Sequence, residues 1–447
     1  MTLKSPIIII GGGLAGCEAA WQLSKRNDQV KLHEMRPKSF SPAHKSPYLA
    51  ELVCSNSLRS NAIENAVGLL KEEMRMMESL VMEAADATAV PAGKALAVNR
   101  TDFSRYIEEK LLARRNLEII REEILDIPQD QTVVIATGPL TSDALARSIA
   151  LHTGSDHLYF YDAISPIIYG DSIDQSIVFR ASRYGNDEGD YLNCPLERDE
   201  YERFWKALTE GEEVPLKPFE ESRFFGGCLP IEVMAGSGVR TLAFGPMKPV
   251  GLINPQTGKQ PYAVVQLRQE DKDGILFNMV GFQTKLTWPE QRRIFRMIPG
   301  LENVEFARYG SIHRNTFINA PVLLKKTLQL KTHDDIFFAG QITGVEGYVE
   351  SAAMGLAAGL SVATYLTGKE ITPFPDETAL GSLLRYITRP DHRNFQPMNV
   401  NFGLFPPLPG KVPKRDRGRH YAQRSLKALK NWKLSTSESD QAALEKV

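Results

Sequence analysis

Three glycines near the start of the chain have the spacing of a phosphate-binding turn. Gly11, Gly13 and Gly16 form G-x-G-x-x-G. The apolar run Ile7–Ile10 precedes them and a stretch of helical character follows. The first glycine permits a tight turn, the second lets the backbone approach a pyrophosphate, and the third allows close packing of helix on strand. Glu34 ends the next expected strand, where a carboxylate can accept hydrogen bonds from ribose hydroxyls. The pattern predicts dinucleotide binding.

A second glycine-rich segment lies late in the chain. The run Ile336–Gly355 (IFFAGQITGVEGYVESAAMG) is typical of a buried strand, then glycines, then a helix. Gly340, Gly344 and Gly347 would let backbone N–H groups approach a ligand, although a turn that serves packing alone uses the same residues. A glycine-rich site near each end of the chain favours FAD over NAD. We expect the cofactor to be held by Gly11, Gly12, Gly13, Leu14, Ala15, Gly16, Glu34, Gly340, Gln341, Thr343, Gly344 and Tyr348.

The elements around these motifs predict the fold class. Residues 7–34 form a strand–helix–strand pattern, and buried strands recur at 131–138 and 335–340. From about Ile173 to Val304, between the last two of these strands, aromatic residues, prolines and glycines are frequent. The sequence predicts an α/β fold: a Rossmann-type FAD-binding domain, glutathione-reductase-like, interrupted by a smaller mixed α+β insertion domain. Helices are expected over Glu64–Ala85 and Thr101–Arg115, the second capped by Thr101 or Asp102.

The length of 447 residues suggests two or three domains. The limits that we expect are 1–172 and 321–410 for the two parts of the FAD-binding domain, 173–320 for the insertion and 411–447 for a basic C-terminal tail. The apolar stretch Ser351–Thr367 contains two glycines and many alanines, and it reads as a buried helix rather than a membrane span.

Charge and composition exclude some classes of protein. The formal net charge is −1, with 43% hydrophobic and 24% charged residues, which excludes a generally polycationic nucleic-acid coat and an acidic disordered chain. The segment Lys411–Lys433 nevertheless carries nine Lys or Arg residues against one Asp, and Arg292, Arg293 and Arg296 form a smaller cluster. Either could contact nucleic-acid phosphates, or be a solvated charged face.

The four cysteines, Cys17, Cys54, Cys194 and Cys228, are far apart in sequence. Without a C-x-x-C pair, a zinc ribbon and a thioredoxin-like dithiol are disfavoured. Four cysteines in so long a chain, with no signal-peptide core at the N-terminus, favour a reducing cytoplasm. The eight histidines show no HxxxH or HExxH spacing, so no metal site is expected. On residue type alone, a cysteine is most often a small buried hydrophobe.

Six motifs together resemble one family. They are IGGGLAGCEAAWQL (10–23), HEMRP (33–37), ELVCSNSLRSN (51–61), GGCLPIE (226–232), HRNTFINAP (313–321) and FFAGQITGVEGYVESAA (337–353). In these segments the chain resembles the folate- and flavin-dependent tRNA (uracil-5-)-methyltransferase family, TrmFO, and the resemblance extends to about Pro409. It implies that 5,10-methylenetetrahydrofolate donates a one-carbon unit, that reduced FAD supplies reducing equivalents, and that a T-loop uridine of tRNA becomes 5-methyluridine. NADPH or NADH would reduce the flavin.

The resemblance also implies roles for two cysteines. C5 of uracil is a poor nucleophile, and a thiolate added at C6 makes it reactive. Cys228, among small residues, is our choice for this attack, and Cys54 is assigned to the flavin side, although the roles could be exchanged. Ser55 and Asn56 are good N-cap residues, so we expect a helix there whose dipole favours the Cys54 thiolate. Cys17 and Cys194 are expected to serve packing.

A base in a folded tRNA loop has to be turned out before it reaches a cysteine and a flavin. Phe224, Phe225 or Trp288 could stack on it. His313 and Arg314 could face folate or RNA, and a salt bridge in a loop is an equal alternative.

Three other readings stay open. A related flavin and folate enzyme modifies the anticodon wobble uridine, but its long C-terminal helical region would not fit a chain of this length. A plain NAD(P)H-dependent flavoprotein reductase is the second alternative. A non-catalytic flavin-bound RNA-binding protein is the third, and the two cysteine motifs argue against it.

Overall fold

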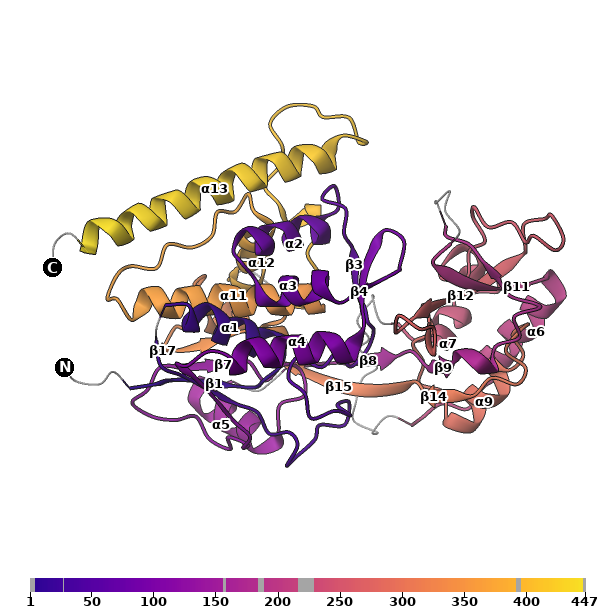
Figure 1. Cartoon of the computed structure of the whole chain (residues 1–447), viewed down its shortest axis with the longest axis horizontal. Helices are drawn as coiled ribbons and strands as arrows, with labels where there is room; N and C mark the ends of the chain where they lie inside the picture. The colour runs from indigo at the N-terminus through magenta and orange to yellow at the C-terminus, as the bar shows by residue number, and fades with distance from the viewer. Residues whose placement is uncertain are drawn as a thin grey trace.

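The computed structural model of the chain describes residues 5–26, 28–155, 158–183, 189–215, 229–390 and 395–444. Figure 1 shows a larger lobe that holds both termini and a smaller lobe at the right. Two antiparallel strands, β8 (Leu158–Ile164) and β15 (Ser311–Phe317), pair along their whole length between the lobes. The chain therefore enters and leaves the smaller lobe through one two-stranded ribbon.

The larger lobe is built on a six-stranded sheet in the order β16-β17-β7-β1-β2-β6. Strands β1 and β7 are buried at every position, as expected for strands covered on both faces. The late strand β17 pairs in parallel with the early strand β7, so the lobe is assembled from both ends of the chain. The strands are β1 (Ile7–Ile10), β2 (Val30–His33), β6 (Leu117–Ile120), β7 (Val133–Ile135), β16 (Gln329–Leu330) and β17 (His333–Phe338).

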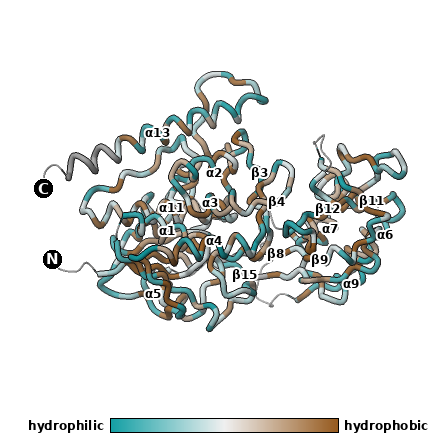
Figure 2. The backbone as a smooth tube through the Cα atoms, in the orientation of Figure 1, coloured by the Kyte–Doolittle hydropathy of each residue, from teal (hydrophilic) through white to brown (hydrophobic). Residues whose placement is uncertain are grey.

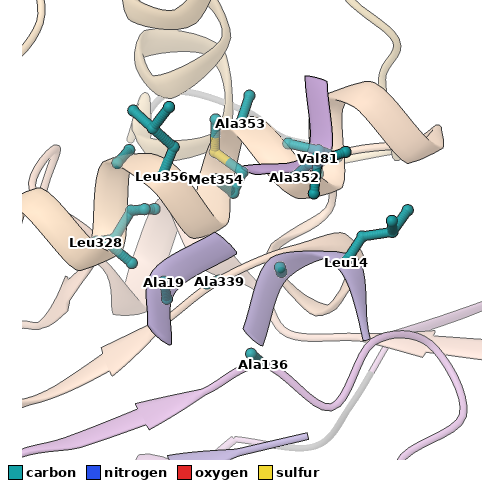
Figure 3. Packing of buried hydrophobic residues seen from close by; sticks show 14 of the residues in the cluster. Leu14, Ala19, Val81, Ala136, Leu328, Ala339, Ala352, Ala353, Met354 and Leu356 are labelled. Carbon is teal, nitrogen blue, oxygen red and sulfur yellow. The ribbon is translucent and has the colours of Figure 1, made fainter. Parts of the chain in front are cut away.

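Two helices that begin at the glycine motifs pack closely on each other. They are α1 (Leu14–Ser24) and α11 (Tyr348–Tyr365). A Cβ atom added at Gly355 of α11 would lie 2.2 Å from the carbonyl oxygen of Ala15 in α1. Only glycine permits this approach, and Figure 3 shows the small side chains of both helices in the surrounding core. The expectation that Ser351–Thr367 forms a buried helix is confirmed.

The larger lobe contains further helices. They are α2 (Ala66–Met76), α3 (Leu80–Ala87), α4 (Arg100–Leu112), α5 (Asp143–Thr153), α10 (Ala320–Leu323), α12 (Ala379–Thr388) and α13 (Arg417–Leu444). Helix α13 packs on α2. A small sheet, β3-β5-β4, adds β3 (Ser57–Ser60), β5 (Ala95–Val98) and β4 (Ala89–Val90). Much of the basic C-terminal segment lies in α13, along which hydrophilic residues predominate in Figure 2.

Two helix predictions need correction. The single helix expected over Glu64–Ala85 is two helices, because Glu78 has a φ of 57° and Ser79 accepts a hydrogen bond from Met82 N–H as the N-cap of α3. Helix α4 is capped by Asn99, whose side-chain oxygen accepts the backbone N–H groups of Thr101 and Asp102. Neither Thr101 nor Asp102, the expected residues, is the N-cap.

The smaller lobe is a second six-stranded sheet, in the order β10-β11-β12-β13-β9-β14. Its strands are β9 (Ile167–Tyr169), β10 (Phe179–Arg180), β11 (Tyr191–Leu196), β12 (Ala263–Gln269), β13 (Leu276–Met279) and β14 (Phe306–Arg308). Its helices are α6 (Arg198–Thr209), α7 (Ile231–Gly236), α8 (Thr241–Phe244) and α9 (Trp288–Phe295). The Rossmann-type α/β fold with a mixed insertion is confirmed. The exact domain limits stay a prediction, and β9 shows that the second sheet draws on residues before 173.

Candidate functional site

A cavity opens at the carboxyl ends of four parallel strands of the larger lobe. This edge is where open α/β sheets bind their ligands. The cavity is lined from β1 by Ile10 and Gly11, from β2 by His33 and Glu34, from β7 by Ala136, Thr137 and Gly138, and from β17 by Gly340. The first residues of α1 and α11 complete the wall with Gly13, Leu14, Ala15, Tyr348 and Ser351.

The three motif glycines have different surroundings. Gly11 has a φ of 106°, and an added Cβ would lie 2.6 Å from the carbonyl oxygen of Ala136. At Gly16 an added Cβ would lie 1.8 Å from the carbonyl oxygen of Gly11, so this glycine lets the helix close on the turn. Gly13 lines the cavity, and nothing lies within 4 Å of its added Cβ. This geometry suits a pyrophosphate at the helix N-terminus, and contact with a cofactor stays a prediction.

Glu34 is buried, and its carboxylate is already saturated with donors. One oxygen accepts from the backbone and Nε of Arg36 at 3.0 and 2.8 Å, and the other accepts from Gly12 N–H at 2.9 Å and from Arg36 Nη2 at 3.2 Å. Burial raises the pKa of Glu34, but the hydrogen bonds and charge of Arg36 outweigh it and hold the pKa below its usual range. A carboxylate has about four acceptor positions, so a ribose hydroxyl would have to share one of these.

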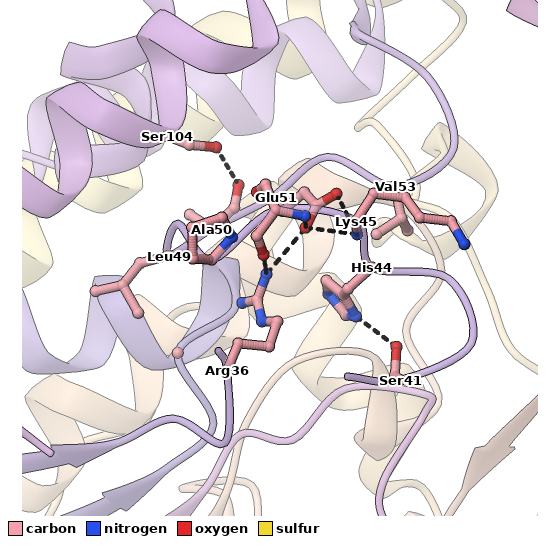
Figure 4. Close-up of polar contacts among 12 residues, drawn as sticks. Arg36, Ser41, His44, Lys45, Leu49, Ala50, Glu51, Val53 and Ser104 are labelled. Atoms are coloured by element: carbon pink, nitrogen blue, oxygen red, sulfur yellow. Dashed lines mark hydrogen bonds and ion pairs between the residues drawn. The ribbon is translucent and has the colours of Figure 1, made fainter. Parts of the chain in front are cut away.

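Arg36 extends this network beyond the predicted residues. Its Nη1 donates to Glu51 Oε2 at 3.0 Å, and Glu51 in turn accepts the backbone N–H of Lys45 (Figure 4). Arg36, Glu51 and His44 all line the cavity. No role was predicted from the sequence for Arg36 or Glu51, which appeared only within the HEMRP and ELVC motifs. The position of Arg36 two residues after Glu34 could have indicated an ion pair between them.

The late glycine segment contributes unevenly to the cavity. Gly340 (φ 83°) and Gln341 line it. Thr343 is buried, and its hydroxyl donates to the carbonyl of Gly340 at 2.7 Å. Gly344 has a φ of 85°, and a Cβ atom added to it would lie 2.3 Å from the ring of Phe395. Thr343 and Gly344 therefore support the turn without lining the cavity. Gly12 and Gly16 of the first motif do not line it either.

The turn that carries Cys54 is fastened to the start of α11. The Tyr348 hydroxyl oxygen accepts the backbone N–H groups of Cys54 at 2.6 Å and of Ser55 at 3.1 Å. Tyr348 lines the cavity, as does Val53. Burial, with a smaller effect from Cys54, raises the pKa of Tyr348 above its usual range, so the phenol stays neutral. The half-buried Cys54 is therefore held next to two lining residues, Val53 and Tyr348, and does not itself line the cavity.

The helix expected after Cys54 is absent, and this prediction is wrong. Strand β3 follows instead, because the Asn56 side chain donates across the chain to the carbonyls of Val98 and Gln269 rather than capping a helix. No helix dipole points at Cys54 from this segment.

Three arginines surround the turn in its place. Arg100 and Arg308 each donate to the Cys54 carbonyl at 3.2 Å. Arg268 donates to the Ser55 hydroxyl at 2.7 Å. Glu270 pairs with Arg100 at 2.5 Å.

Burial lowers the pKa of Arg268 and of Arg308, which still carry their charge at neutral pH. Arg100 comes from the larger lobe and the other two from the smaller lobe, so both lobes set the position of Cys54. Nothing in the sequence marks these arginines as a group.

The other three cysteines differ in whether the structure describes them. Cys228, with Phe224 and Phe225, lies outside the described residues. The segment that follows it is fixed by Glu232, which accepts from the Thr284 hydroxyl at 2.9 Å and from Lys285 N–H at 2.7 Å. Cys17 and Cys194 are fully buried, and burial raises the pKa of both thiols well above the usual range. Neither suits nucleophilic chemistry.

The basic and aromatic candidates for RNA contact are also placed. In the smaller lobe, Arg292 and Arg293 are exposed on α9. Arg296 donates to the Val304 carbonyl at 2.9 Å and is half-buried, so it serves the fold. Trp288 is 62% exposed and stacks on Tyr309, with ring centroids 5.5 Å apart and planes 16° apart. His313 and Arg314 lie on β15, in the connecting ribbon.

The cavity residues fit a dinucleotide. The His33 Nδ1 atom is buried and has no partner among the described residues, and burial lowers the pKa of His33 so that the ring is a neutral donor or acceptor. Gly138, like Gly13, has nothing within 4 Å of an added Cβ. The described residues include no cluster of His, Cys, Asp or Glu that could hold a metal ion. Across the same ranges, no helix combines the length and apolar character of a membrane span.

Comparisons with known proteins agree with these features. The family model described as glucose inhibited division protein A matches residues 6–370. Methylenetetrahydrofolate–tRNA-(uracil-5-)-methyltransferase TrmFO of Syntrophus aciditrophicus is 67% identical over 438 residues, covering 98% of this chain and 99% of the relative. The TrmFO of Pelotomaculum thermopropionicum is 58% identical, with 96% and 98% covered.

Among solved structures, GidA of Aquifex aeolicus in its form II crystal has a TM-score of 0.66 at 17% identity, covering 87% of this chain and 68% of that one. The form I crystal has a TM-score of 0.65 at 19% identity, covering 86% and 70%. At these levels of sequence identity, the two structures support the assignment of the fold alone.

Proposed function

The chain belongs to the TrmFO family, within the wider glucose inhibited division protein A family, and on this premise we propose that it methylates a T-loop uridine of tRNA at C5. 5,10-Methylenetetrahydrofolate is the proposed one-carbon donor, and NAD(P)H the proposed source of electrons. The observation that carries the proposal is the attachment of the Cys54 turn to Tyr348, which holds a cysteine next to lining residues of a dinucleotide cavity.

FAD is the cofactor that this cavity would hold. Gly13 and the N-terminus of α1 would contact the pyrophosphate, and Gly340, Gln341 and Tyr348 also line the cavity. Arg36 keeps Glu34 ionised and oriented, so that a shared ribose hydrogen bond is accepted by a fixed carboxylate. When bound, FAD would supply the reducing equivalents that convert a methylene into a methyl group.

The uracil chemistry requires one thiolate. On this proposal the Cys228 sulfur adds to C6 of the uracil, and C5 then attacks the folate methylene. Loss of the C5 proton expels the folate amine and leaves a methylene group on C5. A hydride equivalent from the reduced cofactor would convert this group to methyl, and the Cys228 thiolate then leaves C6. Cys54 works on the opposite, flavin side, where Arg100, Arg268 and Arg308 favour negative charge. Which of the two cysteines attacks uracil stays a prediction.

RNA docking draws on two surfaces. The exposed cations of α13 and the segment before it would contact phosphates; they are Lys411, Lys414, Arg415, Arg417, Arg419, Lys427, Lys430 and Lys433. In the smaller lobe, Trp288 offers one free face of a stacked aromatic group, and a splayed base gains stacking energy on such a face. Arg292, which donates to the Tyr309 hydroxyl at 2.8 Å, lies beside it.

One assay separates this proposal from its alternatives. The purified protein is incubated with methylenetetrahydrofolate, NADPH and unmodified tRNA, and methylated uridines are mapped. T-loop product supports the proposal, whereas modification at the wobble position indicates the related anticodon enzyme. NADPH oxidation without product indicates a plain reductase, and inertness indicates a binding protein.

Two variants test the cysteine assignment. Cys228→Ala should abolish methyl transfer and leave the yellow flavin bound, because the cysteine acts on uracil and not on the cofactor. Cys194→Ala is the matched control, since Cys194 is fully buried in the sheet of the smaller lobe. Full activity of Cys228→Ala contradicts the assignment.

A further inference from the structure

A second cavity lies at the far ends of the two helices that begin at the first cavity. Helix α11 contributes Leu360, Ser361 and Thr364 from its later turns, and Arg26 follows the end of α1. Helix α13 and the segment 369–374 close the other side. Lys433 lines this cavity and is also one of the exposed cations proposed for tRNA docking; the proposed methyl transfer uses no other residue of the cavity.

Cationic side chains surround the cavity. Its charged lining residues are Arg26, Lys326, Lys369, Lys433 and the single carboxylate Glu370. Lys326 forms an ion pair with Asp376, whereas Lys433 donates to the carbonyl of Met76 at 2.9 Å, which is a neutral acceptor. The excess of positive charge favours an anionic ligand.

The wall of the cavity is apolar and partly aromatic. Trp432 of α13 stacks on Phe374, with ring centroids 4.2 Å apart and planes 25° apart. Its indole Nε1–H is buried and has no acceptor among the described residues. Buried donors of this kind normally have a partner, so the orphaned indole indicates that a ligand supplies the acceptor. Leu360, Ile371 and Leu384 add flat apolar surface.

We propose that this cavity binds a nucleoside monophosphate or a close chemical equivalent: a small anion that carries a flat ring. The phosphate would meet the lysine and arginine side chains, the ring would lie against the apolar wall, and a polar atom would accept from the indole of Trp432. An inorganic anion would leave the apolar wall unused, and an uncharged ring would leave the cations unused. The inference is independent of the proposed methyl transfer.

Both cavities are lined by α11, and Arg26 of the second cavity follows the end of α1. Helices α1 and α11 are in such close contact that a Cβ added at Gly359 would lie 3.0 Å from the carbonyl oxygen of Ala19. A ligand of the second cavity therefore binds to a rigid unit that also forms the wall of the first.

Equilibrium dialysis tests the proposal on the full chain saturated with FAD, so that the first cavity is filled. The probes are AMP, adenosine and inorganic phosphate at one salt concentration. AMP should bind once per chain, and the other two should each bind at least about tenfold more weakly. Trp432→Phe keeps the stacked ring but removes the N–H, and should weaken AMP about tenfold. Lys433→Gln should weaken it by a similar factor.

Lys430→Gln is the matched control, because Lys430 is exposed on the same helix and does not line the cavity. Its affinity for AMP should equal that of the unaltered chain. The proposal is overturned if AMP does not bind at millimolar concentration, or if phosphate alone binds as tightly, which indicates an adventitious ion only. AMP binding that survives both Trp432→Phe and Lys433→Gln also overturns it, because the nucleotide then lies elsewhere.

Discussion

The substitution Tyr348→Phe tests whether the Cys54 turn is positioned from α11. It removes one oxygen atom, which accepts the N–H groups of Cys54 at 2.6 Å and of Ser55 at 3.1 Å. The ring itself remains, so the packing of the first turn of α11 is largely kept.

The loss should be moderate for stability and large for catalysis. An unsatisfied buried donor costs about 1–3 kcal/mol, and both N–H groups lie in half-buried residues that water can partly reach, so the free energy of unfolding should fall by about 2 kcal/mol. A shift of about 1 Å in a reacting group costs on the order of a hundredfold in rate. We therefore expect kcat for methyl transfer to fall about a hundredfold while KM for tRNA stays unchanged.

Single-turnover methylation, urea unfolding and the flavin absorption spectrum measure these effects together. Because burial raises the pKa of Tyr348 above its usual range, the phenol is neutral throughout, and the ratio of variant to wild-type rates should not change between pH 6 and pH 9. Tyr365→Phe is the matched control, since Tyr365 ends the same helix and its hydroxyl has no hydrogen bond within the described part of the chain. A Tyr348→Phe protein with wild-type kcat and stability refutes the positioning role.

Three further outcomes are expected. Gly16→Ala should prevent FAD retention, visible as a colourless protein, because the new Cβ would lie 1.8 Å from the Gly11 carbonyl oxygen; a yellow variant contradicts the assigned turn. Trp288→Ala should raise KM for tRNA about tenfold, because about 1–3 kcal/mol of stacking energy is lost, and should leave NADPH oxidation unchanged. Trp288→Phe should restore most of the affinity for tRNA. Equal KM values for all three proteins would show that Trp288 is not part of the RNA surface. Burial raises the pKa of Glu73 to about 7, so neutral Glu73 contributes up to about 3 kcal/mol to the free energy of unfolding; this contribution is complete below pH 4.5 and is lost as pH rises through 7. Urea unfolding between pH 5 and pH 8 should show this fall in the wild type and not in Glu73→Gln. Parallel pH profiles of the two proteins would refute the prediction.

Local patterns in the sequence predicted the parts of the molecule that depend on neighbouring residues. The G-x-G-x-x-G turn, the strand before it and the helix after it follow from residues that touch one another along the chain. The alanine and glycine composition of α11 likewise predicted its burial. The split of the sheet between both ends of the chain followed from two such patterns, at β7 and β17.

The surroundings of Cys54 could not be predicted in the same way. Arg100, Arg268 and Arg308 come from three distant segments, and a single arginine in a strand or at a helix start carries no sign of its partner. The helix expected after Cys54 failed for a related reason. Asn56 is a common N-cap, but its amide finds carbonyls of Val98 and Gln269, which only the tertiary fold supplies.

The narrow connection between the lobes has a mechanical consequence. Within the described ranges, only the ribbon of β8 and β15 carries the chain from one lobe to the other, so a rotation of the smaller lobe about it would leave both six-stranded sheets intact. Such a rotation would separate Arg308 from the Cys54 carbonyl and Arg268 from the Ser55 hydroxyl. Arg100 belongs to the larger lobe and would keep its contact with Cys54. Arg268 and Arg308 therefore contact the Cys54 turn only while the two lobes keep their present arrangement.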